Sequence, residues 1–272
     1  MLEYKVNTHG AELQSLKLNG HEYLWQGDPA YWGRRAPILF PIVGKVAGGW
    51  MGQHGFARDA EFTKVGDRYV LNDGPKENYP YRFELAVEYK AEGKRLYCKW
   101  TVTNRDTKPI HFQIGAHPAF NLPEYNAEDA IHGYMECYDA AGRVIVPELT
   151  HYLIGGLRVP FGQPKPLPTE GTLLPIKNGT FAADAFIPEG SQVKSVALLD
   201  KNKNKVLTVG CETAQAYGLW APNKPGCPFV CLEPWCGITD TEGFVGDISE
   251  RELNHSLKPG ESYEFTYWIE IA

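Results

Sequence analysis

The chain carries no excess of positive charge, no segment typical of a leader peptide and no long apolar run. Its 272 residues include 27 Lys and Arg against 33 Asp and Glu, a net charge of -6, which argues against a nucleic-acid-binding domain. The N-terminus lacks the basic and apolar segments of a signal peptide. Apolar runs such as APILFPIV are too short to span a bilayer. We therefore expect a cytoplasmic protein without nucleic-acid or membrane partners.

Cysteine is also scarce, and its 6 positions form no compact disulfide framework. Cys227, Cys231 and Cys236 lie near one another in the chain, which raises the question of a zinc site. Zinc-binding cysteine pairs usually have two residues between them, whereas three and four residues separate these cysteines. We therefore predict buried, reduced thiols near strands and no metal site.

The sequence has no long amphipathic helical pattern, and its periodicity is that of β-structure. Residues 82–89 and 96–102 are rich in alternating β-branched and aromatic side chains, and residues 91–94 between them predict a hairpin turn. Glycine and proline, 28 and 20 residues, interrupt such segments at short intervals. Because no composition shift or repeat divides the chain, we predict one all-β domain over residues 1–272, built as a large antiparallel sandwich.

Two blocks near the N-terminus combine cations with a histidine. Arg34 precedes a proline-rich apolar run, and a guanidinium binds hydroxyls, carboxylates or phosphates through its planar fork. His54 and Arg58 lie in GQHGFARD, where the glycines allow the backbone to approach a ligand closely. Taken alone, each block is more typical of a solvated loop than of a site, so their importance depends on other groups.

Three further stretches hold single polar groups in apolar surroundings. His117 lies in QIGAHPAFN, where an imidazole can donate or accept a proton near neutral pH. Glu233 follows a strand-like run in VCLEPWCG; it is a candidate general base, and Trp235 offers an apolar face to a sugar ring. Asp184 is the charged residue of FAADAFI and could accept a hydroxyl hydrogen bond. The alternatives are a packed histidine, a turn-capping glutamate and a turn aspartate.

The motifs RRAPILFPIVGK, HGFARD, GAHPAFN, FAADAF and CLEPWCG, in this order, resemble the aldose 1-epimerase (galactose mutarotase-like) superfamily, and most closely its LacX-like branch. The resemblance implies a β-supersandwich with an open sugar-binding cleft. It also implies an isomerase that interconverts the α and β anomers of an aldose without a cofactor. His117 and Glu233 match the catalytic residues of the family, and His54 and Asp184 match its sugar-binding positions.

One departure from the family pattern concerns arginine. Classical galactose mutarotases carry an arginine in the stretch that matches residues 44–50, which here reads GKVAGGW. We expect Arg34 to substitute for it, and the missing arginine argues against assigning galactose as the substrate from the resemblance alone. The HGFAR stretch also resembles hexose-6-phosphate mutarotases, in which an arginine matched by Arg58 holds the phosphate. We therefore expect the protein to bind a sugar or a sugar phosphate, and to be a monomer or a homodimer. The alternative function is that of a non-catalytic sugar-binding protein.

Overall fold

The computed structural model describes residues 1–74 and 76–272, and the regular secondary structure of that part of the chain is almost entirely β-strand. The helices within it are two single 3-10 turns, η1 (Ala57–Asp59) and η2 (Ile248–Glu250), so none that is described could span a membrane. The predicted all-β fold with large antiparallel sheets is confirmed.

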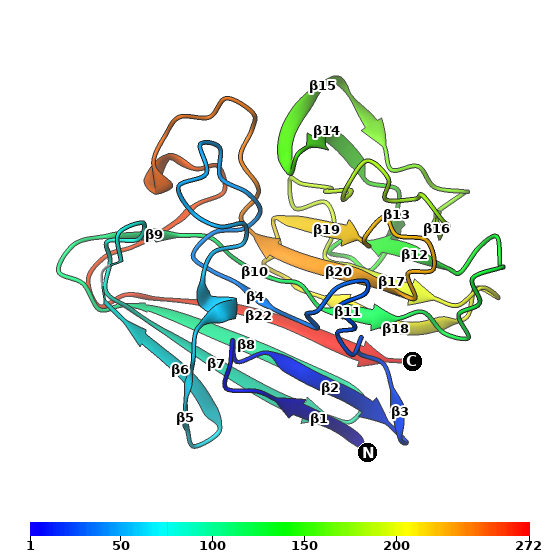
Figure 1. Cartoon of the computed structure of the whole chain (residues 1–272), viewed down its shortest axis with the longest axis horizontal. Helices are drawn as coiled ribbons and strands as arrows, with labels where there is room; N and C mark the ends of the chain where they lie inside the picture. The colour runs from blue at the N-terminus through cyan, green and yellow to red at the C-terminus, as the bar shows by residue number, and fades with distance from the viewer. Residues whose placement is uncertain (75) are drawn as a thin grey trace.

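The largest sheet contains ten antiparallel strands and extends across the molecule in Figure 1, from β5 and β6 at the lower left to β12 and β13 at the right. Its order is β13-β12-β17-β18-β22-β8-β7-β6-β5, with β16 paired to β12. The strands are β5 (Thr63–Val65), β6 (Arg68–Asp73), β7 (Phe83–Glu92), β8 (Arg95–Asn104), β12 (Gly133–Tyr138), β13 (Val144–Ile145), β16 (Leu173–Ile176), β17 (Ser195–Leu199), β18 (Lys205–Gly210) and β22 (Ser262–Ile271). The predicted hairpin is β7–β8, whose turn residue Gly93 has a φ of 62°.

The second sheet has five strands in the order β11-β20-β10-β4, with β19 also paired to β20. These strands are β4 (Ile38–Leu39), β10 (Ile114–Ala116), β11 (Ala119–Asn121), β19 (Ala216–Trp220) and β20 (Phe229–Cys236). All of β20 is buried, and its alternate side chains point to opposite faces. Val230 and Leu232 join the main core, which also contains Trp100 and Phe265 of the large sheet. Glu233 and Trp235 therefore lie on the opposite face, away from that core.

Three smaller sheets complete the chain. The first is β1 (Leu2–Val6), β2 (Leu13–Leu18) and β3 (His21–Glu22), and another pairs β9 (Ile110–Phe112) with β21 (His255–Leu257). The hairpin of β14 (Glu148–Ile154) and β15 (Leu157–Pro166) stands above β19 in Figure 1. The tip of this hairpin is Gly155 and Gly156, and two hydrogen bonds hold it in place. Lys45 Nζ donates to Gly155 O at 2.9 Å, and Thr239 Oγ1 donates to Gly156 O at 2.6 Å.

Candidate functional site

A cavity of about 400 Å³ lies on the face of the five-stranded sheet that points away from the main core. The β14–β15 tip and the segment after β4 contribute to its walls. All seven site residues predicted from the sequence line this cavity: Arg34, His54, Arg58, His117, Asp184, Glu233 and Trp235. Residues from distant parts of the chain thus converge on one site.

Strand register brings His117 and Glu233 together. Ile114 pairs with Cys236 and Ala119 with Cys231, so the same antiparallel register continued through the link between β10 and β11 sets His117 opposite Glu233. His117 Nε2 lies 3.2 Å from Glu233 Oε2, and the two residues are only 6% and 1% exposed. An imidazole and a carboxyl group are therefore held side by side by the sheet itself.

Two glycines make room for Trp235 beside this pair. A Cβ at Gly115 would lie 2.7 Å from Trp235 Cδ1, and a Cβ at Gly218 would lie 2.7 Å from its Cζ2. These residues belong to β10 and β19, the strands on either side of β20. The indole can therefore lie across both neighbouring strands only because neither position carries a side chain.

Burial governs the protonation of the central pair. It lowers the pKa of His117 to about 3, with Arg58 adding to the effect, and it raises the pKa of Glu233 well above its ordinary value, with Asp184 adding to that. Burial therefore favours a neutral imidazole beside a protonated carboxyl, a form in which the pair has one proton that can be transferred between the two groups. Transfer of that proton from Glu233 to His117 gives the ion pair without changing the number of protons on the two residues. In either form, one group can donate a proton and the other can accept one.

His54 is held as a single tautomer. The backbone N–H of Gly44 donates to His54 Nδ1 at 3.0 Å, and because an amide can only donate, Nδ1 carries no proton. Burial lowers the pKa of His54 well below its ordinary value, with His117 and Arg58 adding to the effect. The ring is therefore neutral, with its proton on Nε2. Nε2 lies at the cavity wall, 3.4 Å from the side-chain amide of Gln53, and the ring centroid lies 5.4 Å from that of His117.

Two tryptophans that the sequence reasoning did not single out enclose His117. The Trp32 ring stacks on the imidazole with centroids 4.8 Å apart and an interplanar angle of 26°, and Trp220 meets it edge-on at 5.7 Å. Both line the cavity. Trp32 lies two residues before Arg34, a spacing that could have suggested a shared face, whereas Trp220 at the end of β19 gave no local signal. The aromatic lining suits the apolar faces of a sugar.

A cationic region occupies another part of the wall. Arg34 Nη2 donates to Asp59 Oδ1 at 2.8 Å, and Arg58 Nη2 donates to Gln53 O at 2.6 Å. Burial lowers the pKa of Arg58 to about 10, with Arg34 adding to the effect, so the guanidinium stays charged at neutral pH. Arg58 Nε is buried and has no hydrogen-bond partner within residues 1–74 and 76–272. Arg58 Nε lies 3.8 Å from Asp59 Oδ2, within ion-pair distance, so two guanidinium groups share the carboxylate of Asp59.

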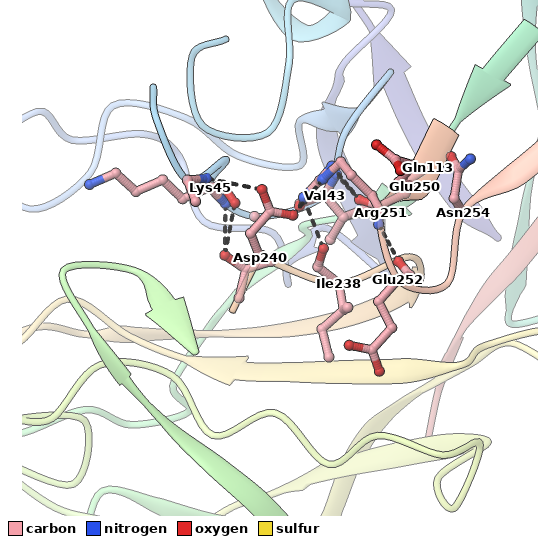
Figure 2. A network of polar contacts seen from close by, with 12 residues as sticks. Val43, Lys45, Gln113, Ile238, Asp240, Glu250, Arg251, Glu252 and Asn254 are labelled. Atoms are coloured by element: carbon pink, nitrogen blue, oxygen red, sulfur yellow. Dashed lines mark hydrogen bonds and ion pairs between the residues drawn. The ribbon is translucent and has the colours of Figure 1, made fainter. Parts of the chain in front are cut away.

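A buried polar network, drawn in Figure 2, includes Val43 and Asp240, the chain neighbours of the cavity residues Gly44 and Thr239. Arg251 Nε donates to Asp240 Oδ1 at 2.6 Å and its Nη1 donates to Gln113 Oε1 at 2.7 Å. Arg251 Nη2 donates to Val43 O at 3.1 Å, and Gln113 Oε1 also accepts from Val43 N at 3.0 Å. Asp240 Oδ2 accepts from Ala47 N at 2.9 Å. The network, which we call the Arg251 brace, therefore fixes the backbone on both sides of Gly44, the residue that orients His54.

The cysteines form no disulfide. Burial raises the pKa of Cys98, Cys137 and Cys211 to about 12, as expected for inert thiols. Cys231 and Cys236 point to opposite faces of β20, since Cys236 packs in the main core while Cys231 packs beside Phe229 on the cavity face. The sequence trio therefore does not converge, but Cys231 does lie near His117 and Glu233.

Comparison with known proteins identifies the family. The family model described as Aldose 1-epimerase matches residues 1–270. Protein LacX, chromosomal, from Lactococcus lactis subsp. lactis is 33% identical over 99% of this chain and 96% of its own length. The X-ray structure of a galactose mutarotase related enzyme from Lactobacillus acidophilus aligns at 29% identity with a TM-score of 0.85, covering 100% of this chain and 95% of that one.

A galactose mutarotase-like protein from Lactobacillus casei ATCC 334 gives the same TM-score, 0.85, at 27% identity, covering 100% of this chain and 97% of that one. These matches span nearly the whole chain rather than one motif. They confirm the resemblance that the sequence motifs indicated and the fold that it implied. The chain belongs to the aldose 1-epimerase family and has the galactose mutarotase-like fold.

Proposed function

We propose that the protein is an aldose 1-epimerase, which interconverts the α and β anomers of a hexose or related aldose. The observation that carries the proposal is the 3.2 Å contact between His117 and Glu233 in the wall of a cavity of about 400 Å³. Anomer exchange needs one group to remove the proton of the C1 hydroxyl and another to protonate the ring oxygen. A carboxyl and an imidazole that share one proton supply both functions.

In the proposed reaction, Glu233 as a carboxylate takes the C1 hydroxyl proton while His117 as an imidazolium gives its proton to the ring oxygen. The C1–O5 bond breaks and a free aldehyde forms. Rotation about C1–C2 presents the other face of the carbonyl, and closure reverses both proton transfers. Because burial favours the neutral forms of both groups, this assignment requires sugar binding to move the shared proton from Glu233 to His117.

The other wall residues have matching functions in this scheme. His54 Nε2–H is a neutral donor for a sugar oxygen, and Asp184 is an acceptor for a hydroxyl. Trp32, Trp220 and Trp235 offer aromatic faces to the C–H faces of the ring. Both proton transfers come from side chains of the chain itself, so the proposal includes no cofactor. It treats residues 1–272 as one functional unit.

The test is NMR of freshly dissolved α-glucose and α-galactose, which follows the approach to anomeric equilibrium with and without protein. Glu233→Gln keeps the size of the side chain but removes its basicity, and the expected loss of rate is on the order of 10²–10⁴-fold. Glu264→Gln is the matched control, since that glutamate is 54% exposed on β22 and pairs with Lys99. Full activity in folded Glu233→Gln would remove Glu233 from the mechanism.

A phosphorylated sugar is a second candidate substrate, favoured by the cationic wall. Arg34 and Arg58 share one carboxylate, and the buried Nε of Arg58 has no hydrogen-bond partner in the described part of the chain. We expect Arg58→Gln to raise KM for glucose 6-phosphate at least ~10-fold, as the loss of a charged hydrogen bond implies, with less effect on glucose. An equal effect on both sugars would refute phosphate recognition by Arg58.

A further inference from the structure

We propose that His117, Cys231 and Glu233 form a binding site for one zinc-class divalent cation. The site lies at the base of the sugar cavity, and its occupation would exclude the sugar from the His117–Glu233 pair. This inference concerns a ligand rather than a reaction, so cation binding does not depend on the proposed function being correct.

The geometry of the three donors carries the proposal. One nitrogen of His117, the sulfur of Cys231 and one carboxylate oxygen of Glu233 all lie within 4.8 Å of one another, and all three residues are buried. Cys231 and Glu233 are two positions apart on β20 and therefore share a face. The 3.2 Å between His117 Nε2 and Glu233 Oε2 is close to the edge of a tetrahedron with metal–ligand bonds of about 2.0–2.1 Å. Closing the remaining gap among the three donor atoms, which lie within 4.8 Å of one another, would complete three ligands.

The carboxylate donor also has a free valence. Glu233 Oε2 is buried and makes no hydrogen bond to any of the described residues, although it lies 3.2 Å from His117 Nε2. Buried polar atoms are normally satisfied, and an unsatisfied one indicates a missing water, ion or ligand. Such an atom within the three-residue cluster, on a residue that lines the cavity, is an independent sign that something binds there.

Charge and ligand type select the class of cation. A thiolate and a carboxylate together balance one divalent ion, and a neutral imidazole adds no charge, so the loaded site would be neutral where a buried net charge is costly. Sulfur and nitrogen donors favour Zn²⁺ or Cd²⁺ over Mg²⁺ or Ca²⁺, which prefer oxygen. Three protein ligands leave a fourth position open toward the cavity, as in zinc sites that keep a water.

The experiment is a titration of the reduced, chelator-stripped full chain with Cd²⁺, followed by the ultraviolet thiolate-to-metal charge-transfer band. Isothermal calorimetry with Zn²⁺ gives the stoichiometry. We expect one equivalent of either ion and no binding of Mg²⁺. Cys231→Ser should abolish the band, while Cys227→Ser, the same change at a half-buried cysteine four positions earlier, should keep it.

His117→Gln is the second variant, because it leaves the thiol in place. Loss of a direct ligand should weaken Zn²⁺ binding by at least ~100-fold, since even outer-shell substitutions cost 10–100-fold. Circular dichroism checks that each variant is folded. The proposal is overturned if the wild-type chain shows no charge-transfer band, if folded Cys231→Ser retains it, or if His117→Gln binds Zn²⁺ as tightly as the wild type. Because the readout is metal binding, failure of the mutarotase assay leaves it unaffected.

Discussion

Arg251→Met tests how much the Arg251 brace contributes to stability. The Arg251 side chain is 0% exposed and its partner Asp240 is 3% exposed, so the substitution leaves a carboxylate buried without its counter-charge. It also leaves the carbonyl oxygens of Val43 and Ile238 without that donor. Breaking a buried ion pair by removing one partner costs about 3–5 kcal/mol, which is a large part of the total stability of a typical domain.

The assay is equilibrium urea unfolding followed by tryptophan fluorescence. Arg143→Met is the control, because Arg143 pairs with Asp139 while 78% of its side chain is exposed, and such pairs contribute about 0–1 kcal/mol. Adding Asp240→Asn to Arg251→Met keeps an acceptor for Ala47 N but removes the buried charge, so the double variant should recover part of the loss. A loss below about 1 kcal/mol in Arg251→Met, or no recovery in the double variant, would refute the electrostatic explanation.

Two further predictions concern the walls of the cavity. Gly44 has a φ of 69°, and an added Cβ would lie 2.2 Å from Thr239 Cβ, so Gly44→Ala should lower the free energy of unfolding in urea by more than about 2 kcal/mol. Gly48→Ala is the control, because Gly48 has a φ of 79° but open space around it, and this change should cost about 1 kcal/mol. Trp32→Leu removes the ring stacked on His117 and should raise KM for the preferred sugar more than it lowers kcat. Trp50→Leu, a change outside the cavity lining, should leave KM and kcat unchanged. If the two variants change KM equally, the result argues against sugar stacking on Trp32.

Local patterns made the strands predictable. Residues 82–89 and 96–102 alternate apolar and polar side chains around a glycine, and they form most of β7 and β8. The strand that carries Glu233 was also recognisable, because VCLEPWC is apolar apart from one carboxylate. Periodicity of two is a property of a single strand, so the sequence of that strand is sufficient to reveal it.

The contacts that shape the site could not be predicted in this way. Gln113 and Arg251 are 138 positions apart, and their hydrogen bond depends on how several loops pack against the five-stranded sheet. Trp220 reaches His117 only because β19 pairs with β20, a choice of neighbour that the pattern of either strand does not contain. The proximity of Cys231 to His117 likewise follows from register rather than from cysteine spacing, which is why cysteine spacing alone gave no metal prediction.

The cavity separates two tasks that an aldose epimerase would have to perform. His117 and Glu233 are held by strands whose register is fixed over the whole of β20, and their target atoms, C1 and the ring oxygen, are common to every cyclic aldose. Arg34, His54 and Arg58 lie instead on loops and on η1, where hydrogen bonds to backbone and to Asp59 set their positions. Substitutions in the loops can change which sugar is bound without moving the acid–base pair. Differences in substrate between this chain and its relatives should therefore map to loop positions of the cavity wall, such as those within residues 34–58, and not to His117 or Glu233.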